Sequence, residues 1–71
     1  MTLKKLNSKF VSAVGYDPSR KLLEIKFKLS GRVYAFLDVQ KETYQQFVQA
    51  KSKAEFFKKF IKNNYKNFLL G

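Results

Sequence analysis

Three segments in the first half of the chain have the patterns of β-strands. Within residues 22–29, the positions from 23 onward alternate strictly, with apolar side chains at the odd positions and charged ones between them. Such alternation predicts a strand with one face in the core and the other in water. Residues 10–16 and 32–39 have strand character as well, and Gly15 to Ser19 and Ser30-Gly31 supply the turns. We therefore expect an antiparallel meander.

The second half of the chain shows helical spacing. Tyr44, Phe47 and Val48 recur at i, i+3 and i+4, which predicts a helix from about Lys41 to Ala50. Ser52 followed by Glu55 matches a capping box, so a second helix is predicted to begin there. At about 100° per residue its apolar side chains fall within one sector of about 140° and its lysines in the opposite sector. The apolar set is Phe56, Phe57, Phe60 and Ile61, and the lysines are Lys58, Lys59, Lys62 and Lys66.

The predicted fold class is α+β, a three-stranded antiparallel β-meander followed by two helices packed on one face (βββαα). Residues 1–71 form a single domain with its core at about 8–65, and the ends outside this range are candidates for flexible segments. The chain has no cysteine for disulfides, no apolar stretch of the roughly 20 residues that span a bilayer, and no apolar signal core near its start. We expect a cytoplasmic protein.

The second hairpin decides where two aromatic residues lie. If Ser30-Gly31 is a two-residue loop, Phe27 pairs with Tyr34 and Ile25 with Phe36, which places Tyr34 and Phe36 in the core. A four-residue loop keeps this parity, whereas a three-residue loop reverses it. Serine is not the preferred residue for the positive φ of a type I′ turn. We favour core packing for these rings, with stacking on nucleic-acid bases as the alternative.

Several short sequences resemble the KTSC domain across roughly residues 8–65. They are Val14-Gly15-Tyr16-Asp17, the segment 33–39 (VYAFLDV), and the segment 50–57 (AKSKAEFF) followed by Ile61. That family is a small module found at the C-terminus of some lysyl-tRNA synthetases and alone in bacterial and phage proteins, and RNA binding is the function suggested for it. The central Tyr-x-Tyr of the family corresponds to Tyr34-Ala35-Phe36, so the second hydroxyl is absent, and a position that is often Gly in the family is Ala54.

Composition argues against an enzyme. The chain has neither His nor Cys, which excludes the usual nucleophile–base pairs and thiolate or imidazole metal sites. Its acidic residues show no paired-carboxylate spacing, and two of them have turn and cap roles in this interpretation; the five are Asp17, Glu24, Asp38, Glu42 and Glu55. We expect no catalytic residue, no metal site, no cofactor and no small-molecule substrate.

The net charge indicates an acidic partner. Fifteen Lys and Arg residues against five Asp and Glu residues give +10, enough to attract polyanions. We expect binding of nucleic acid, RNA rather than DNA, through the lysine face of the second helix, at Lys58, Lys59, Lys62 and Lys66. Secondary contacts are predicted at Lys26, Lys28 and Arg32. With Tyr34 and Phe36 in the core, the lysines rather than the family-like motif are expected to touch the partner.

Three other interpretations of these features stand beside nucleic-acid binding. The lysine face can serve solubility alone, as a solvated helix exterior. The strip formed by Val33, Ala35 and Leu37, or an open sheet edge, can dock on an acidic protein. The lysines also suit an anionic membrane surface, but the apolar face of the same helix is expected in the core.

Overall fold

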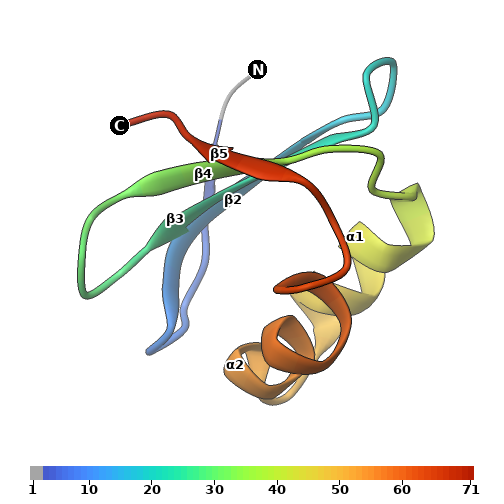
Figure 1. The fold of residues 1–71 in the computed structure, drawn as a ribbon. Helices are drawn as coiled ribbons and strands as arrows, with labels where there is room; N and C mark the ends of the chain where they lie inside the picture. The colour runs from blue at the N-terminus through green and yellow to red at the C-terminus, as the bar shows by residue number, and fades with distance from the viewer. Residues whose placement is uncertain (1–2) are drawn as a thin grey trace.

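The chain folds as one twisted antiparallel sheet with its helices packed against one face (Figure 1). The structure is a computed structural model that describes residues 3–71. The strands are adjacent in chain order: β1 (Lys4–Lys5), β2 (Val11–Asp17), β3 (Leu22–Phe27), β4 (Val33–Phe36) and β5 (Asn67–Leu69). Helix α1 (Lys41–Gln49), helix α2 (Lys53–Phe56) and the π-helix η1 (Phe57–Ile61) connect β4 to β5.

The α+β class is confirmed, but the predicted count of three strands is wrong for the residues that the structure describes. The sheet has two further strands, β1 beside β2 and β5 beside β4, one at each edge. They contain two and three residues, too few to show the period-two alternation that identifies a strand in a sequence. Both edges of the sheet are therefore formed by residues outside the predicted core of 8–65.

The core lies between the sheet and the helices. The sheet contributes five fully or almost fully buried side chains, α1 adds Phe47, and η1 adds Phe57 and Ile61. Those of the sheet are Val11, Val14, Leu23, Ile25 and Phe36. The predicted α1 face of Tyr44, Phe47 and Val48 does pack on this core. Burial of an aromatic or large aliphatic side chain contributes about 1.5–3 kcal/mol, so these contacts are the main stabilisation of a chain without disulfides.

The β3–β4 register differs from the predicted one by two residues. Ile25 pairs with Tyr34 and Leu23 with Phe36, because the loop comprises the four residues Lys28 to Gly31. Gly31 has φ +71° and its N–H donates to the carbonyl of Phe27 at 2.8 Å, which closes this turn without a positive φ at serine. The parity is unchanged, so Tyr34 and Phe36 do face the core side. Leu29, expected in the core, is fully exposed.

Strand β4 is shorter than predicted. It ends at Phe36 because Asp38 adopts φ +58°, a left-handed conformation that turns the chain out of the sheet. Val39 then returns to the core, where it is fully buried and its N–H donates to the carbonyl of Lys21 at 2.9 Å.

The second helix begins as predicted but does not continue as an α-helix. The hydroxyl of Ser52 accepts from the N–H of Glu55 at 3.3 Å, which confirms the cap. From Phe57 onward the chain is a π-helix, in which the N–H of Lys62 donates to the carbonyl of Phe57 at 2.8 Å. The wider turn changes the phase of the apolar face, so Phe60 is 52% exposed instead of buried.

Within the part of the chain that the structure describes, there is no helix of the length and apolar character needed to cross a membrane.

Candidate nucleic-acid interface

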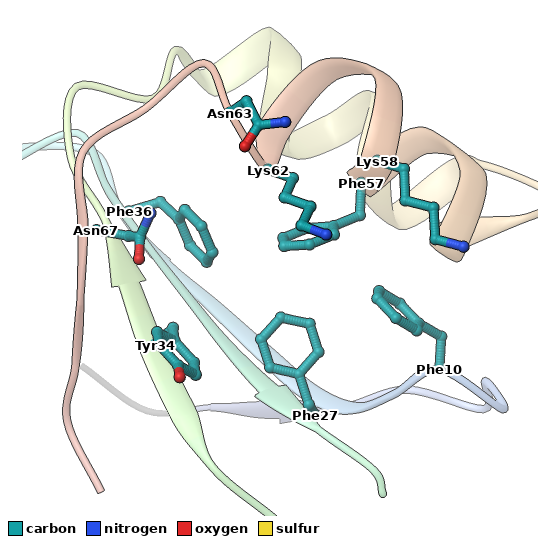
Figure 2. A pocket seen from close by; sticks show the side chains of 9 residues that line it. All are labelled: Phe10, Phe27, Tyr34, Phe36, Phe57, Lys58, Lys62, Asn63 and Asn67. Atoms are coloured by element: carbon teal, nitrogen blue, oxygen red, sulfur yellow. The ribbon is translucent and has the colours of Figure 1, made fainter. Parts of the chain in front are cut away.

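A hollow of about 440 Å³ opens between the inner face of the sheet and the π-helix (Figure 2). We call it the aromatic hollow, because five aromatic side chains line most of it. Its lining residues are Phe10, Phe27, Tyr34, Phe36, Phe57, Lys58, Lys62, Asn63 and Asn67. Small-ligand sites have volumes of about 300–1,000 Å³, so the aromatic hollow is large enough for one flat ring system.

Phe57 holds the walls of the aromatic hollow together. Its ring is 9% exposed and lies edge-on or tilted against Phe27 at 5.3 Å, Phe10 at 5.5 Å and Phe36 at 5.6 Å between ring centroids. Phe27 also meets Tyr34 edge-on at 5.9 Å. Edge-to-face pairs within 4.5–7 Å are favourable, so the rings fix one another. Rigid walls lower the entropic cost of binding a ligand between them.

The position of Phe10 depends on the turn that precedes β2. The hydroxyl of Ser8 accepts from the N–H of Phe10 at 3.1 Å, and the carbonyl of Phe10 accepts from the N–H of Lys28 at 3.1 Å. The ammonium of Lys28 donates to the carbonyl of Ser8 at 3.1 Å. Two hydrogen bonds therefore hold the backbone of Phe10, and a third ties Lys28 to the preceding turn, although Phe10 lies outside the regular strand.

Two lysines are the charged groups of the aromatic hollow. Lys58 and Lys62 are four residues apart on the helical segment, and both side chains reach the hollow; Figure 2 shows that of Lys62 descending between the rings. Both residues are exposed. None of the five acidic residues lines this hollow, and among residues 3–71 the ion pair that forms joins Arg20 to Asp17. The aromatic hollow thus offers two ammonium groups without a protein counter-charge.

Polar groups on the aromatic hollow can both donate and accept hydrogen bonds. They are the side-chain amides of Asn63 and Asn67 and the hydroxyl of Tyr34. The amide nitrogen of Asn67 donates to the carbonyl of Tyr65 at 3.3 Å, which leaves its amide oxygen as an acceptor. Groups of this kind can recognise the polar edge of a ring whose faces contact the aromatic walls.

A second hollow of about 330 Å³ adjoins the first and shares Phe10 with it. We call it the basic hollow. It is lined by Asn7, Ser8, Lys9, Phe10, Lys51, Ser52, Lys53 and Ala54. Lys53 donates to the carbonyl of Ala50 at 3.0 Å, whereas Lys9 and Lys51 are exposed. No acidic residue lines it, so its charge is positive as well.

The structure brings together only part of the predicted lysine set. Lys58 and Lys62 line the aromatic hollow. Lys59 lies on another side of the helical segment, in a shallow hollow with Phe60. Lys66 falls outside the helix, which ends at Ile61, and its carbonyl accepts from the N–H of Leu37. The expectation of one continuous lysine face on a single helix is therefore wrong.

The predicted secondary contacts are dispersed. Lys26 pairs with Val33 and Ala13, positions that face away from the helices. Lys28 is bonded to Ser8, and Arg32 lies in the β3–β4 hairpin, where its carbonyl accepts from the N–H of Phe27 at 2.9 Å.

The family-like motif and the lysines are predicted from the sequence to lie apart, but two of the lysines line the same hollow as the motif. Tyr34 and Phe36 face the core side as predicted, with Phe36 only 2% exposed, and both line the aromatic hollow beside Lys58 and Lys62. Phe10 and the lysines of the basic hollow were not predicted. The sequence shows a lysine next to an aromatic residue at Lys9-Phe10, but nothing local places this pair beside residues 51–58.

Among the described residues, no group of acidic side chains is arranged to hold a metal ion.

Comparison with known proteins places the chain in a family. The model of the KTSC domain matches residues 7–65. A lysine–tRNA ligase from Nostoc sp. is 33% identical over 64 residues, which are 90% of this chain and 11% of that enzyme, so the chain spans about a ninth of the length of this relative. A KTSC domain protein from Yersinia pestis, whose crystal structure is known, has 33% sequence identity with this chain. The two structures superpose with a TM-score of 0.91 over 99% of this chain and 97% of that one. The chain belongs to the KTSC domain family.

Proposed function

We propose that this domain binds nucleic acid, and RNA in preference to DNA, through the aromatic hollow and the adjoining basic hollow. The observation that carries the proposal is the charge of these two surfaces. Their charged side chains are five lysines, and no acidic residue lines either hollow. Phosphate groups are the natural counter-charges for such a surface, because each phosphate contact releases condensed cations and adds to affinity.

The preference for RNA rests on the relatives. One of them is named as a lysine–tRNA ligase, so a KTSC-type segment occurs in a protein that acts on tRNA. We further propose that binding occurs without catalysis, since the chain has neither His nor Cys to act as nucleophile or base near neutral pH. This assigns the domain the role of a binding module.

The proposal is tested by fluorescence anisotropy with a labelled single-stranded RNA at salt concentrations from about 50 mM upward. We expect measurable affinity that falls with salt. The double variant Lys58→Gln/Lys62→Gln should lose affinity, and its slope of log K against log salt should be smaller by about 1.4, which is twice the ~0.7 per phosphate contact of single strands.

The matched control is Lys5→Gln/Lys41→Gln. It removes the same charge from exposed positions outside both hollows, one on the edge strand β1 and one at the start of α1, and should leave most of the affinity and slope intact. Equal losses in both double variants would show that net charge alone acts, and undetectable RNA binding at about 50 mM salt would contradict the proposal.

A second candidate function is docking to an acidic protein on the outer sheet face, the face without helices (Figure 1). The predicted strip of Val33, Ala35 and Leu37 is not open, because Ala35 is fully buried beside Phe68 of β5. However, Phe68 and Leu70 are 46% and 48% exposed and extend the strip. Pull-downs that persist after nuclease treatment and fail with Phe68→Ser would favour this function over the first.

A further inference from the structure

We infer that the aromatic hollow takes one unpaired base of a single-stranded nucleic acid, while the adjoining basic hollow takes a neighbouring backbone phosphate. This inference rests on the proposed function and specifies it, because it assigns a ligand class to each hollow. It also gives Tyr34 and Phe36, the residues of the family-like motif, a place at the ligand rather than in the core alone.

The walls of the aromatic hollow match the flat faces of a base. Rings from β3, β4, η1 and the turn before β2 surround it, and edge-on or tilted ring contacts centred on Phe57 and Phe27 fix them. Every nucleic-acid base has a π face that stacks on aromatic side chains. In a duplex those faces are already stacked on neighbouring base pairs, so only an unpaired base can enter.

The lysines distinguish a nucleotide from an uncharged apolar ligand. A ligand that fills the aromatic hollow would cover the ammonium of Lys62, which Figure 2 shows among the rings. Covering an ammonium without an anion is unfavourable, because the charge loses its hydration and gains no counter-charge. A nucleotide brings a phosphate together with its ring, so it offsets this cost, whereas an uncharged apolar side chain of a peptide does not.

The relation between the two hollows favours a strand rather than a free base. Phe10 lines both, so a base stacked on one side of its ring directs the adjoining backbone toward Lys9 and Lys51. Neither of these lysines has an acidic partner within residues 3–71. A chain that places its base and its next phosphate in adjoining hollows is held in a fixed orientation.

The base requirement is tested with two oligonucleotides of equal length and charge, one a single-stranded RNA and the other its abasic backbone. We expect the base-bearing strand to bind about 5- to 150-fold more tightly, the factor that corresponds to stacking of one base. A blunt RNA duplex of the same length should bind no more tightly, per phosphate, than the abasic backbone, because its bases are already stacked on one another.

Phe10→Leu is the variant that removes a stacking face and keeps an apolar side chain. It should bring the ratio of base-bearing to abasic affinity close to 1 and leave the salt dependence unchanged. The matched control is Phe60→Leu, because Phe60 is an exposed ring beside Lys59 that lies outside both hollows. That variant should retain the full ratio.

A titration of the unaltered domain with 5′-AMP, followed by ¹H NMR, gives a readout that needs no variant. The ring protons of Phe10, Phe27 and Tyr34 should shift with 5′-AMP and stay in place with inorganic phosphate, which should shift only backbone amides near the lysines of the two hollows.

The outcomes separate this inference from the proposed function. Equal affinity for base-bearing and abasic strands would overturn the base site and leave electrostatic RNA binding standing. Absence of affinity for every nucleic acid at about 50 mM salt would remove both. Ring shifts spread over Phe60 and Phe68 rather than the aromatic hollow would also overturn the assigned site.

Discussion

The hydroxyl of Tyr16 donates a hydrogen bond to the backbone carbonyl of Val39, which ties β2 to the connection between β4 and α1. The ring of Tyr16 also stacks on Tyr44 of α1, with centroids 5.0 Å apart and planes 10° from parallel. One side chain thus joins three parts of the fold. Tyr16 belongs to the segment Val14-Gly15-Tyr16-Asp17, which resembles the KTSC family. The contacts of Tyr16 give a structural reason for that resemblance.

Tyr16→Phe should lower the free energy of unfolding by about 0.5–1.5 kcal/mol, because it leaves the Val39 carbonyl without its donor while preserving the stacked ring. Urea denaturation followed by circular dichroism measures the change. Tyr34→Phe is the matched control, since the structure shows no hydrogen bond of that hydroxyl within residues 3–71. A loss as large in the control would contradict the role of the Val39 contact.

The raised pKa of Tyr16 predicts a loss of stability at alkaline pH. Burial raises the pKa of Tyr16 above its usual 10.0, and the charges of Glu42 and Asp17 raise it further. The folded state therefore holds this proton more strongly than the unfolded state, so the stabilisation is complete below pH 10 and is lost as the pH rises through the folded-state pKa. The stability difference between the unaltered domain and Tyr16→Phe should therefore shrink as the pH rises above 10, as shown by urea denaturation at each pH. A constant difference would contradict it.

The lowered pKa of Asp17 predicts a loss of stability at acidic pH. A hydrogen bond from the Ser19 hydroxyl, at 2.7 Å, is the main cause that lowers the pKa of Asp17, with smaller effects from backbone N–H groups and Arg20. The folded state favours the charged carboxylate of Asp17. The resulting stabilisation is therefore complete above the pKa of the unfolded chain, near 4, and is lost as the pH falls through the pKa of the folded state.

Asp17→Asn keeps an acceptor oxygen for the turn but cannot titrate. Its thermal midpoint should change less between pH 5 and 2 than that of the unaltered domain. Glu24→Gln, a change outside this turn, is the control and should preserve the steeper acid dependence. Identical acid profiles for Asp17→Asn and the unaltered chain would count against this assignment.

The elements with strong local patterns could be predicted from the sequence. The alternation of residues 23–27 identified β3, the spacing of Tyr44 and Phe47 identified α1, and Ser52 with Glu55 marked the start of α2. Each of these patterns lies within a few residues, so no knowledge of the tertiary fold is needed.

Features that depend on distant contacts could not be predicted. Strand β5 is recognised only by its pairing with β4, and the π-helix is defined by the Lys62 to Phe57 hydrogen bond rather than by composition. The candidate site could not be predicted for the same reason. Phe10 and Lys58 come to line one hollow only when the sheet and the helical segment pack together. The lysines were found from charge, but their distribution over separate surfaces was not.

Leu29 gives a direct test of the hairpin register. In the predicted two-residue loop it would be a core residue, but in the four-residue loop it is fully exposed. Leu29→Ser should therefore change the free energy of unfolding by no more than about 0.5 kcal/mol. Leu23→Ala, at a fully buried position of β3, should cost about 2–5 kcal/mol in the same urea titration. A loss above about 2 kcal/mol for Leu29→Ser would favour the two-residue loop.

Strand β5 should be part of the folding unit, although the match to the family model ends at residue 65. The N–H of Leu70 donates to the carbonyl of Val33 at 2.7 Å, the carbonyl of Gly71 accepts from the N–H of Val33 at 2.9 Å, and Phe68 lies beside the buried Ala35. Deletion of residues 67–71 should lower the free energy of unfolding by at least about 1–3 kcal/mol, the contribution of two backbone hydrogen bonds.

The deletion should also promote self-association, because β4 becomes an unpaired edge strand. Denaturation and size-exclusion chromatography at several concentrations measure the two effects. Phe68→Ala is the control that keeps the strand and its backbone bonds, so it should stay monodisperse wherever the unaltered domain does. If the shortened chain were as stable and as monodisperse as the full one, β5 would be a peripheral addition, and the contribution of Asn67 to the aromatic hollow would lose its structural support.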